Sequence, residues 1–74
     1  RVNAISAGPL DTISSRVIQG YKTMKNAASE RSPLKRNITL DEVANSALFL
    51  LSDMGTGITG EVLHVDSGYN IMGI

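Results

Sequence analysis

The amino-acid sequence predicts an α/β fold built on a parallel sheet, and the order of its elements is the main evidence. The 74 residues contain a short strand, two helical stretches, a longer amphipathic helix and a second short strand. Strands that alternate with helices usually form a parallel sheet with right-handed crossovers. Because two short strands cannot make a stable sheet by themselves, we expect this chain to be part of a larger α/β domain.

The first strand is expected at residues 1–5, where β-branched residues occur in an alternating pattern. Residues 6–9 (Ser-Ala-Gly-Pro) are expected to end it, because proline fixes φ and lacks an N–H donor. Weak helical spacing follows over residues 12–20, and a second helical stretch covers about 21–30. Pro33 should end that stretch, since the residue before a proline avoids the α region.

The longer helix has the clearest signals. Thr39 and Glu42 have the spacing of a capping box, which predicts a helix start at residue 40. Glycines at positions 55, 57 and 60 predict that the helix stops near Asp53. Residues 61–65 then alternate as a short strand, and Asp66 should accept backbone N–H bonds where that strand ends. The expected apolar face of the helix consists of Leu40, Val43, Ala44, Ala47, Leu48 and Leu51.

Composition excludes several classes of protein. Seven Lys and Arg residues balance seven Asp and Glu residues, so we expect no nucleic acid and no anionic membrane surface as partner. Cysteine is absent, which excludes disulfides and thiolate metal sites, and we expect no metal. No apolar run approaches the roughly 20 residues of a membrane span. A cytoplasmic location is expected, with an organelle lumen as the alternative.

Several motifs resemble one family in order and spacing. Residues 1–12 (RVNAISAGPLDT) resemble the stretch after the sixth strand of short-chain dehydrogenases/reductases. Their S-A-G-P form is similar to the divergent enoyl-[acyl-carrier-protein] reductase branch. Residues 33–36 (PLKR), 41–43 (DEV) and 57–69 (GITGEV leading to VDSGY) are similar to later motifs of the same branch. The resemblance covers essentially the whole chain.

The resemblance implies a specific fold and activity. Residues 1–74 would be the C-terminal portion of a single Rossmann-type domain with a doubly wound parallel sheet. The enzyme would reduce the trans-2 double bond of an acyl chain on acyl carrier protein, using NADH, with NADPH not excluded, and would assemble as a homotetramer. The family's catalytic Tyr and Lys lie upstream of Arg1, so we assign no catalytic residue to this chain.

The cofactor would bind at the turn after the first strand. Ligands of open α/β sheets sit outside the carboxyl ends of strands, where this turn would lie. By resemblance the backbone of Leu10 would meet the carboxamide, and Thr12 would hydrogen-bond the carboxamide or pyrophosphate. The anionic Asp11 would be repelled by a pyrophosphate and should give only backbone contacts. The plainer alternative is that the turn merely ends a strand and Thr12 caps a helix. The assigned residues are Gly8, Pro9, Leu10, Asp11, Thr12, Ile13 and Ser14.

Substrate binding would involve the next segment. Ile18, Tyr21 and Met24 fall where the family keeps a mobile substrate-covering helix, and their spacing of three puts them on one face. That face would form an apolar wall for the acyl chain; the alternative is an ordinary core stripe.

A loose group of basic residues over residues 22–36 has two interpretations. It is either a solvated surface or a docking patch for acyl carrier protein, which is strongly acidic, so that opposite charge would steer the encounter. The basic residues are Lys22, Lys25, Arg31, Lys35 and Arg36.

Apolar residues near the end of the chain exceed what 74 residues can bury. By resemblance Leu48, Leu51, Val62, Val65 and the tail 71–74 would contribute to subunit contacts. His64 is expected to be structural.

Two alternatives stay open. One is another short-chain dehydrogenase/reductase that acts on carbonyls, such as a 3-oxoacyl reductase. The other is a non-catalytic interaction module that uses the amphipathic helix 40–51.

Overall fold

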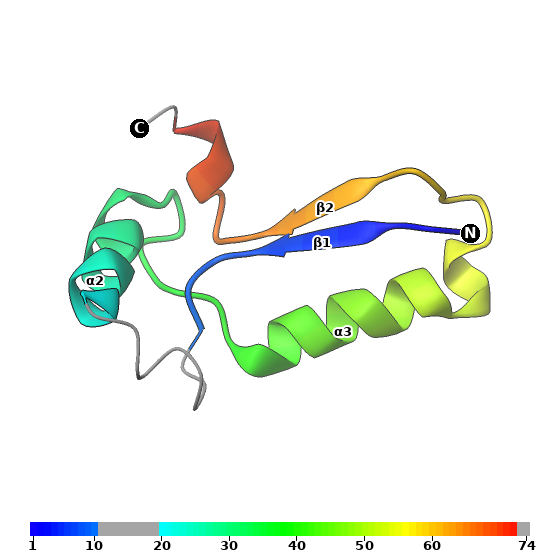
Figure 1. The fold of residues 1–74 in the computed structure, drawn as a ribbon, viewed down its shortest axis with the longest axis horizontal. Helices are drawn as coiled ribbons and strands as arrows, with labels where there is room; N and C mark the ends of the chain where they lie inside the picture. Colours follow the sequence, from blue (N-terminus) through cyan, green and yellow to red (C-terminus); the bar gives the residue numbers. More distant parts are fainter. Residues whose placement is uncertain (11–19, 73–74) are drawn as a thin grey trace.

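A computed structural model describes residues 1–10 and 20–72 of the chain (Figure 1). Strand β1 covers Ala4–Ala7 and strand β2 covers Val62–Val65. Helix α2 covers Tyr21–Arg31 and helix α3 covers Leu40–Leu51. Short 3₁₀ helices follow α3 and β2, at Asp53–Gly55 and Tyr69–Ile71. The predicted strand, second helical stretch, longer helix and last strand are therefore confirmed, whereas the first predicted helical stretch lies outside the described residues except for Gly20.

The two strands pair in parallel, as the element order predicted. Ala4 lies opposite Val62 and Ala7 lies opposite Val65. The expected end of the first strand after residue 5 was wrong, because Ser6 and Ala7 continue the ladder. The small side chains of these two residues fit a strand, and the next N–H, of Gly8, still donates to the Val65 carbonyl at 2.9 Å. The strand therefore carries the chain directly into the Gly-Pro turn.

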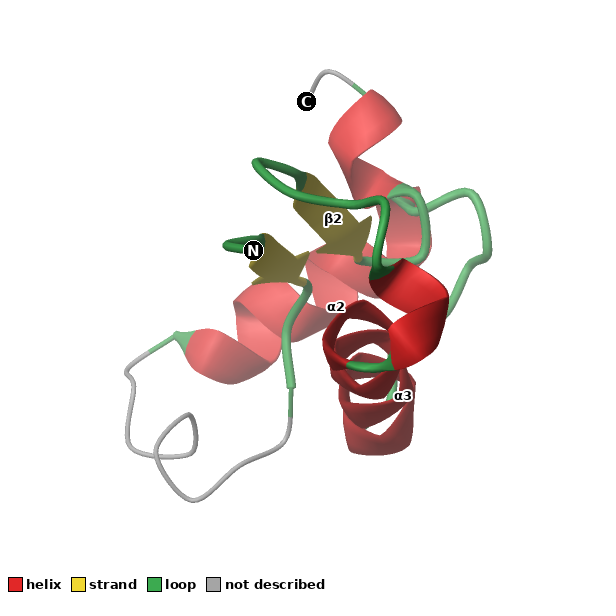
Figure 2. Cartoon of the chain, turned by 90° about the vertical axis from the view of Figure 1, so that its right-hand side faces the viewer, coloured by secondary structure: helices red, strands yellow, loops and turns green. Residues whose placement is uncertain are grey.

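Helix α3 covers one face of this sheet, and the views along and across the strands both place it below them (Figures 1 and 2). Leu50 is buried, with 7% of its surface exposed, and Val43 is half-buried. The predicted apolar face extends beyond the contact with the sheet: Leu48 is 66% and Leu51 is 83% exposed, and the buried Leu50 was not among its predicted residues. Apolar residues occupy more than one side of α3, so helical spacing alone could not select the side that meets the sheet.

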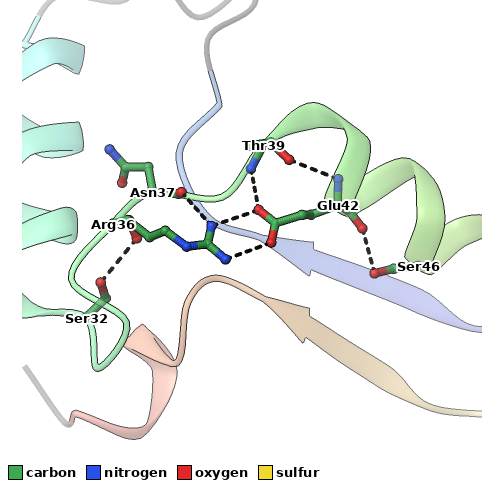
Figure 3. A network of polar contacts seen from close by, with 6 residues as sticks. All are labelled: Ser32, Arg36, Asn37, Thr39, Glu42 and Ser46. Carbon is green, nitrogen blue, oxygen red and sulfur yellow. Dashed lines mark hydrogen bonds and ion pairs between the residues drawn. The ribbon is translucent and has the colours of Figure 1, made fainter.

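The start of α3 is fixed by the predicted capping box. The Thr39 hydroxyl accepts from the Glu42 N–H at 3.2 Å, and the Glu42 carboxylate accepts from the Thr39 N–H at 2.8 Å. Arg36 adds two hydrogen bonds of 2.9 Å to the same carboxylate (Figure 3). The turn that follows α2 is thereby joined to the first turn of α3.

The C-terminal end of α3 is hydrogen-bonded to Arg1, which precedes β1. The Arg1 guanidinium donates to the carbonyls of Leu50 at 2.8 Å and Ile58 at 2.9 Å. Helix α3 ends at Leu51, shortly before the expected Asp53, and the chain then turns sharply at Gly55. A Cβ at Gly55 would lie 2.8 Å from the Phe49 carbonyl oxygen, so only glycine fits at this turn.

Burial is sparse in the part of the chain that the structure describes. Among residues 1–10 and 20–72 the buried apolar side chains are Tyr21, Ile38 and Leu50. No helix in these ranges is long and apolar enough to cross a membrane. Much apolar surface is therefore left for other chain segments to cover.

We expect Glu42→Gln to remove a pH-dependent contribution to the stability of the folded protein. Hydrogen bonds from Arg36 and from the Thr39 backbone lower the pKa of Glu42 from 4.5 to about 2. Because the folded-state pKa is depressed, this contribution is present above the unfolded pKa and is lost as the pH falls through about 2.

Thermal unfolding across this pH range checks the prediction. The melting temperature of wild type should exceed that of Glu42→Gln at neutral pH, and the gap should close as the pH falls below 4.5. Asp41→Asn, which removes the neighbouring exposed carboxylate, is the matched control and should show a smaller pH-dependent gap. A Glu42→Gln gap that stays constant with pH would contradict the assignment.

Candidate functional site

A cavity of about 480 Å³ lies at the carboxyl ends of the two strands. Figure 1 shows α2 and the last 3₁₀ helix beyond the tips of both arrows. Gly8 and Pro9 line the cavity from the turn after β1, and Met24 lines it from α2. Asp66 and Tyr69 line it from the segment after β2. The carboxyl edge of a parallel sheet is where open α/β proteins bind ligands, so this cavity is the candidate site.

The turn after β1 forms one wall, and its glycine is closely packed. A Cβ at Gly8 would lie 3.2 Å from the Asp66 Cα, tighter than ordinary van der Waals contact. Pro9 follows without an N–H donor. Leu10 is half-buried, and its carbonyl accepts a hydrogen bond from the Tyr21 hydroxyl. The turn is therefore held by β2 on one side and by α2 on the other.

The structure brings part of the predicted cofactor segment to this cavity. Gly8 and Pro9 line it, and Leu10 follows directly in the chain. The remaining predicted residues lie outside the described residues: Asp11, Thr12, Ile13 and Ser14. The cofactor assignment of the whole segment stays a prediction.

The predicted substrate residues separate into different environments. Met24 is 51% exposed and lines the cavity, whereas Tyr21 is only 8% exposed and packs against the turn. Ile18 lies outside the described residues. A substrate role for these residues stays a prediction, but the structure already gives Tyr21 a contact that Met24 does not share.

The segment after β2 supplies cavity residues that the sequence did not single out. The Asp66 carboxylate accepts from the N–H groups of Gly68 and Asn70, both at 3.1 Å, which confirms its expected role at the strand end. Gly68 has φ +86°, and a Cβ there would lie 2.9 Å from Pro33. This turn brings Tyr69 and Asn70 to the cavity. In the sequence, the only signal for these cavity residues was the Asp-Ser-Gly turn at residues 66–68.

The basic residues of the predicted docking patch are not equivalent. Arg36 is paired with Glu42 at 2.9 Å, and the Lys35 ammonium donates to the Glu30 carbonyl at 2.8 Å. Lys22 and Arg31 on α2 are exposed. Lys25, next to Met24, is half-buried. Lys22 is therefore the exposed lysine of α2 that lies nearest in sequence to Tyr21 and Met24. Over residues 1–10 and 20–72, no three His, Cys, Asp or Glu side chains gather as a metal site would require.

Comparison with known proteins relates the chain to one family. The model of the family described as "Enoyl-(Acyl carrier protein) reductase" matches residues 1–70. The enoyl-[acyl-carrier-protein] reductase [NADH] FabI of Synechocystis sp. is 51% identical over 74 residues, which are 100% of this chain and 29% of that protein. The corresponding [NADPH] FabI of Staphylococcus aureus is 51% identical over 70 residues, 95% of this chain and 27% of that protein.

A solved structure is similar in fold as well as in sequence. The Bacillus cereus enoyl-acyl carrier protein reductase, solved with NADP+ and indole naphthyridinone, superposes with a TM-score of 0.92 at 49% identity. That match covers 100% of this chain and 29% of the other, so the chain spans less than a third of the length of its relatives. The Rossmann-type α/β fold expected from the resemblance is confirmed. The chain belongs to the enoyl-(acyl carrier protein) reductase family.

Proposed function

We propose that residues 1–74 form the C-terminal portion of a single Rossmann-type domain, and that the complete subunit is an enoyl-[acyl-carrier-protein] reductase. It reduces the trans-2 double bond of an acyl chain on acyl carrier protein in type II fatty acid synthesis. The observation that carries this proposal is the cavity at the carboxyl ends of β1 and β2, where the S-A-G-P turn meets α2. In a chain of this family that edge is suited to a dinucleotide cofactor.

The sheet itself supports a larger domain. A second cavity of about 280 Å³ lies between β1 and α3, lined by Ile5, Leu50 and Leu51 among others. Parallel sheets are normally covered on both faces and contain more than two strands. A further strand beside β1 would cover this apolar cavity and part of the exposed Leu51 side chain.

The described residues fit the nicotinamide end of NADH or NADPH. Gly8 and Pro9 line the cavity, and by resemblance the Leu10 backbone is proposed to meet the planar carboxamide. Thr12 is proposed to hydrogen-bond the carboxamide or pyrophosphate, with Asp11, Ile13 and Ser14 along the same stretch. When bound, this cofactor supplies the hydride. NADH is our proposal; relatives named for NADH and for NADPH match this chain equally well.

The chain's own residues are proposed to bind the ligands and to shape the cavity, and none is assigned a proton transfer. Met24 offers an exposed apolar side chain on the cavity wall, where it can contact the acyl chain. Ile18 and Tyr21 are proposed to complete that wall. The family's catalytic Tyr and Lys belong to the part of the subunit before residue 1, so we assign no catalytic residue here.

We also propose a homotetramer in the cytoplasm. The side of α3 that carries Leu40, Leu48 and Leu51 is exposed in this chain, and Val62 on β2 is exposed as well. Apolar surface of this extent beside an edge strand favours contact with a second copy. The absence of cysteine fits a reducing compartment.

The full-length subunit should oxidise NADH or NADPH in the presence of crotonyl-CoA or a crotonyl carrier substrate, followed by the loss of reduced-cofactor absorbance. The reaction should yield the saturated acyl thioester, identified by mass spectrometry. Turnover of a 3-oxoacyl substrate in place of the enoyl substrate would move the assignment to the carbonyl reducers. Turnover of neither, by a folded protein, would favour an interaction module.

Lys22→Glu in the full-length subunit should weaken use of the carrier substrate. Because Lys22 is exposed on α2, the helix that also carries Met24, reversing its charge opposes an acidic carrier and should raise KM about two- to fivefold. Crotonyl-CoA kinetics should change less, and Lys22→Arg is the matched control. High salt should shrink the difference. An equal loss on both substrates would show that Lys22 supports folding and not docking.

A further inference from the structure

The α2 wall of the cavity contains two alanines to which the resemblance assigns no role. Ala27 and Ala28 line the cavity together with Met24, and both alanines are half-buried. None of these three side chains has an N–H or O–H group to donate. An α-helix rises about 1.5 Å per residue, so Ala28 lies about 6 Å farther along α2 than Met24. The apolar wall therefore continues about one helical turn beyond Met24, away from the end of α2 where Tyr21 contacts the turn after β1.

The facing walls leave room for an apolar group beside these alanines. Pro9 lines the cavity from the turn after β1, and the half-buried Tyr69 lines it from the segment after β2. The Asp66 carboxylate already accepts from the N–H groups of Gly68 and Asn70, both at 3.1 Å, so its oxygens do not depend on a ligand for hydrogen bonds. The volume of about 480 Å³ falls within the range of about 300–1,000 Å³ that is usual for small-molecule sites.

We propose that Ala27 and Ala28 determine the length of the acyl chain that the enzyme accepts. Their small side chains leave space on the α2 wall, so a long chain can extend past Met24. A larger side chain at either position would fill that space and exclude the end of a long chain, while a short chain would end before it. Hydrophobic pockets discriminate between ligands by size in this way. The inference rests on the proposed function, because it requires an acyl substrate in this cavity.

Ala27→Val and Ala27→Leu in the full-length subunit test the proposal. We would measure kcat/KM for trans-2-dodecenoyl-CoA and for crotonyl-CoA, and divide the first value by the second. This ratio should fall about tenfold or more in Ala27→Leu, because part of the long chain loses its place in the cavity, and it should fall less in Ala27→Val. The ratio does not depend on the fraction of enzyme that is folded, and the smaller valine variant tests the proposal even where leucine prevents folding.

Asn26→Leu is the matched control. It places the same leucine side chain on the same helix, at an exposed position that is not among the residues lining the cavity. The ratio of the two kcat/KM values should therefore equal that of wild type. A fall as large as that of Ala27→Leu would show that any apolar substitution on α2 disturbs the long substrate, and would contradict a specific role for Ala27.

Two further outcomes overturn the inference in distinct ways. An unchanged ratio in the folded Ala27→Val and Ala27→Leu variants would exclude a role in chain length and leave the proposed function standing. Failure of the folded wild type to reduce either thioester with NADH or NADPH would remove the proposed function and this inference together.

Discussion

Parallel pairing of β1 with β2 determines where the turns that form the candidate site lie. The register from Ala4 opposite Val62 to Ala7 opposite Val65 brings residues from the two ends of the chain side by side. Because the strands are parallel, both carboxyl ends reach the same edge of the sheet. The Gly8 turn and the Asp66 turn meet there, joined by the Gly8 N–H and the Val65 carbonyl at 2.9 Å. The candidate site exists because of this meeting.

The helices make that edge into a cavity. The ion pair of Arg36 with Glu42 fixes the start of α3 against the preceding turn, and α3 supports the sheet from below. Beyond the edge, the hydroxyl of Tyr21 joins α2 to Leu10, and Met24 of the same helix lines the cavity. Residues that line the cavity are thus positioned by residues that do not line it. Substitutions in either group should affect ligand binding.

Local chemistry in the sequence predicted the structure where a few neighbouring residues determine it. The capping box of Thr39 and Glu42 and the Asp66 turn were both predicted, because each requires only short-range hydrogen bonds. The apolar pattern did not single out Leu50 as the buried residue of α3, since Leu50 and Leu51 are equally apolar and only tertiary packing separates them. The contact of Tyr21 with Leu10 was not predictable from spacing, because it depends on how α2 docks on the turn.

We propose that further strands of the same subunit complete the sheet of this chain. Urea unfolding of the isolated 74-residue chain, followed by circular dichroism and by sedimentation, tests it most directly. The sparse burial around Leu50 and Ile38 predicts a gradual change without a cooperative transition, while the full-length subunit unfolds cooperatively. A single cooperative transition of a monomeric 74-residue chain would contradict the claim and would favour a self-sufficient interaction module.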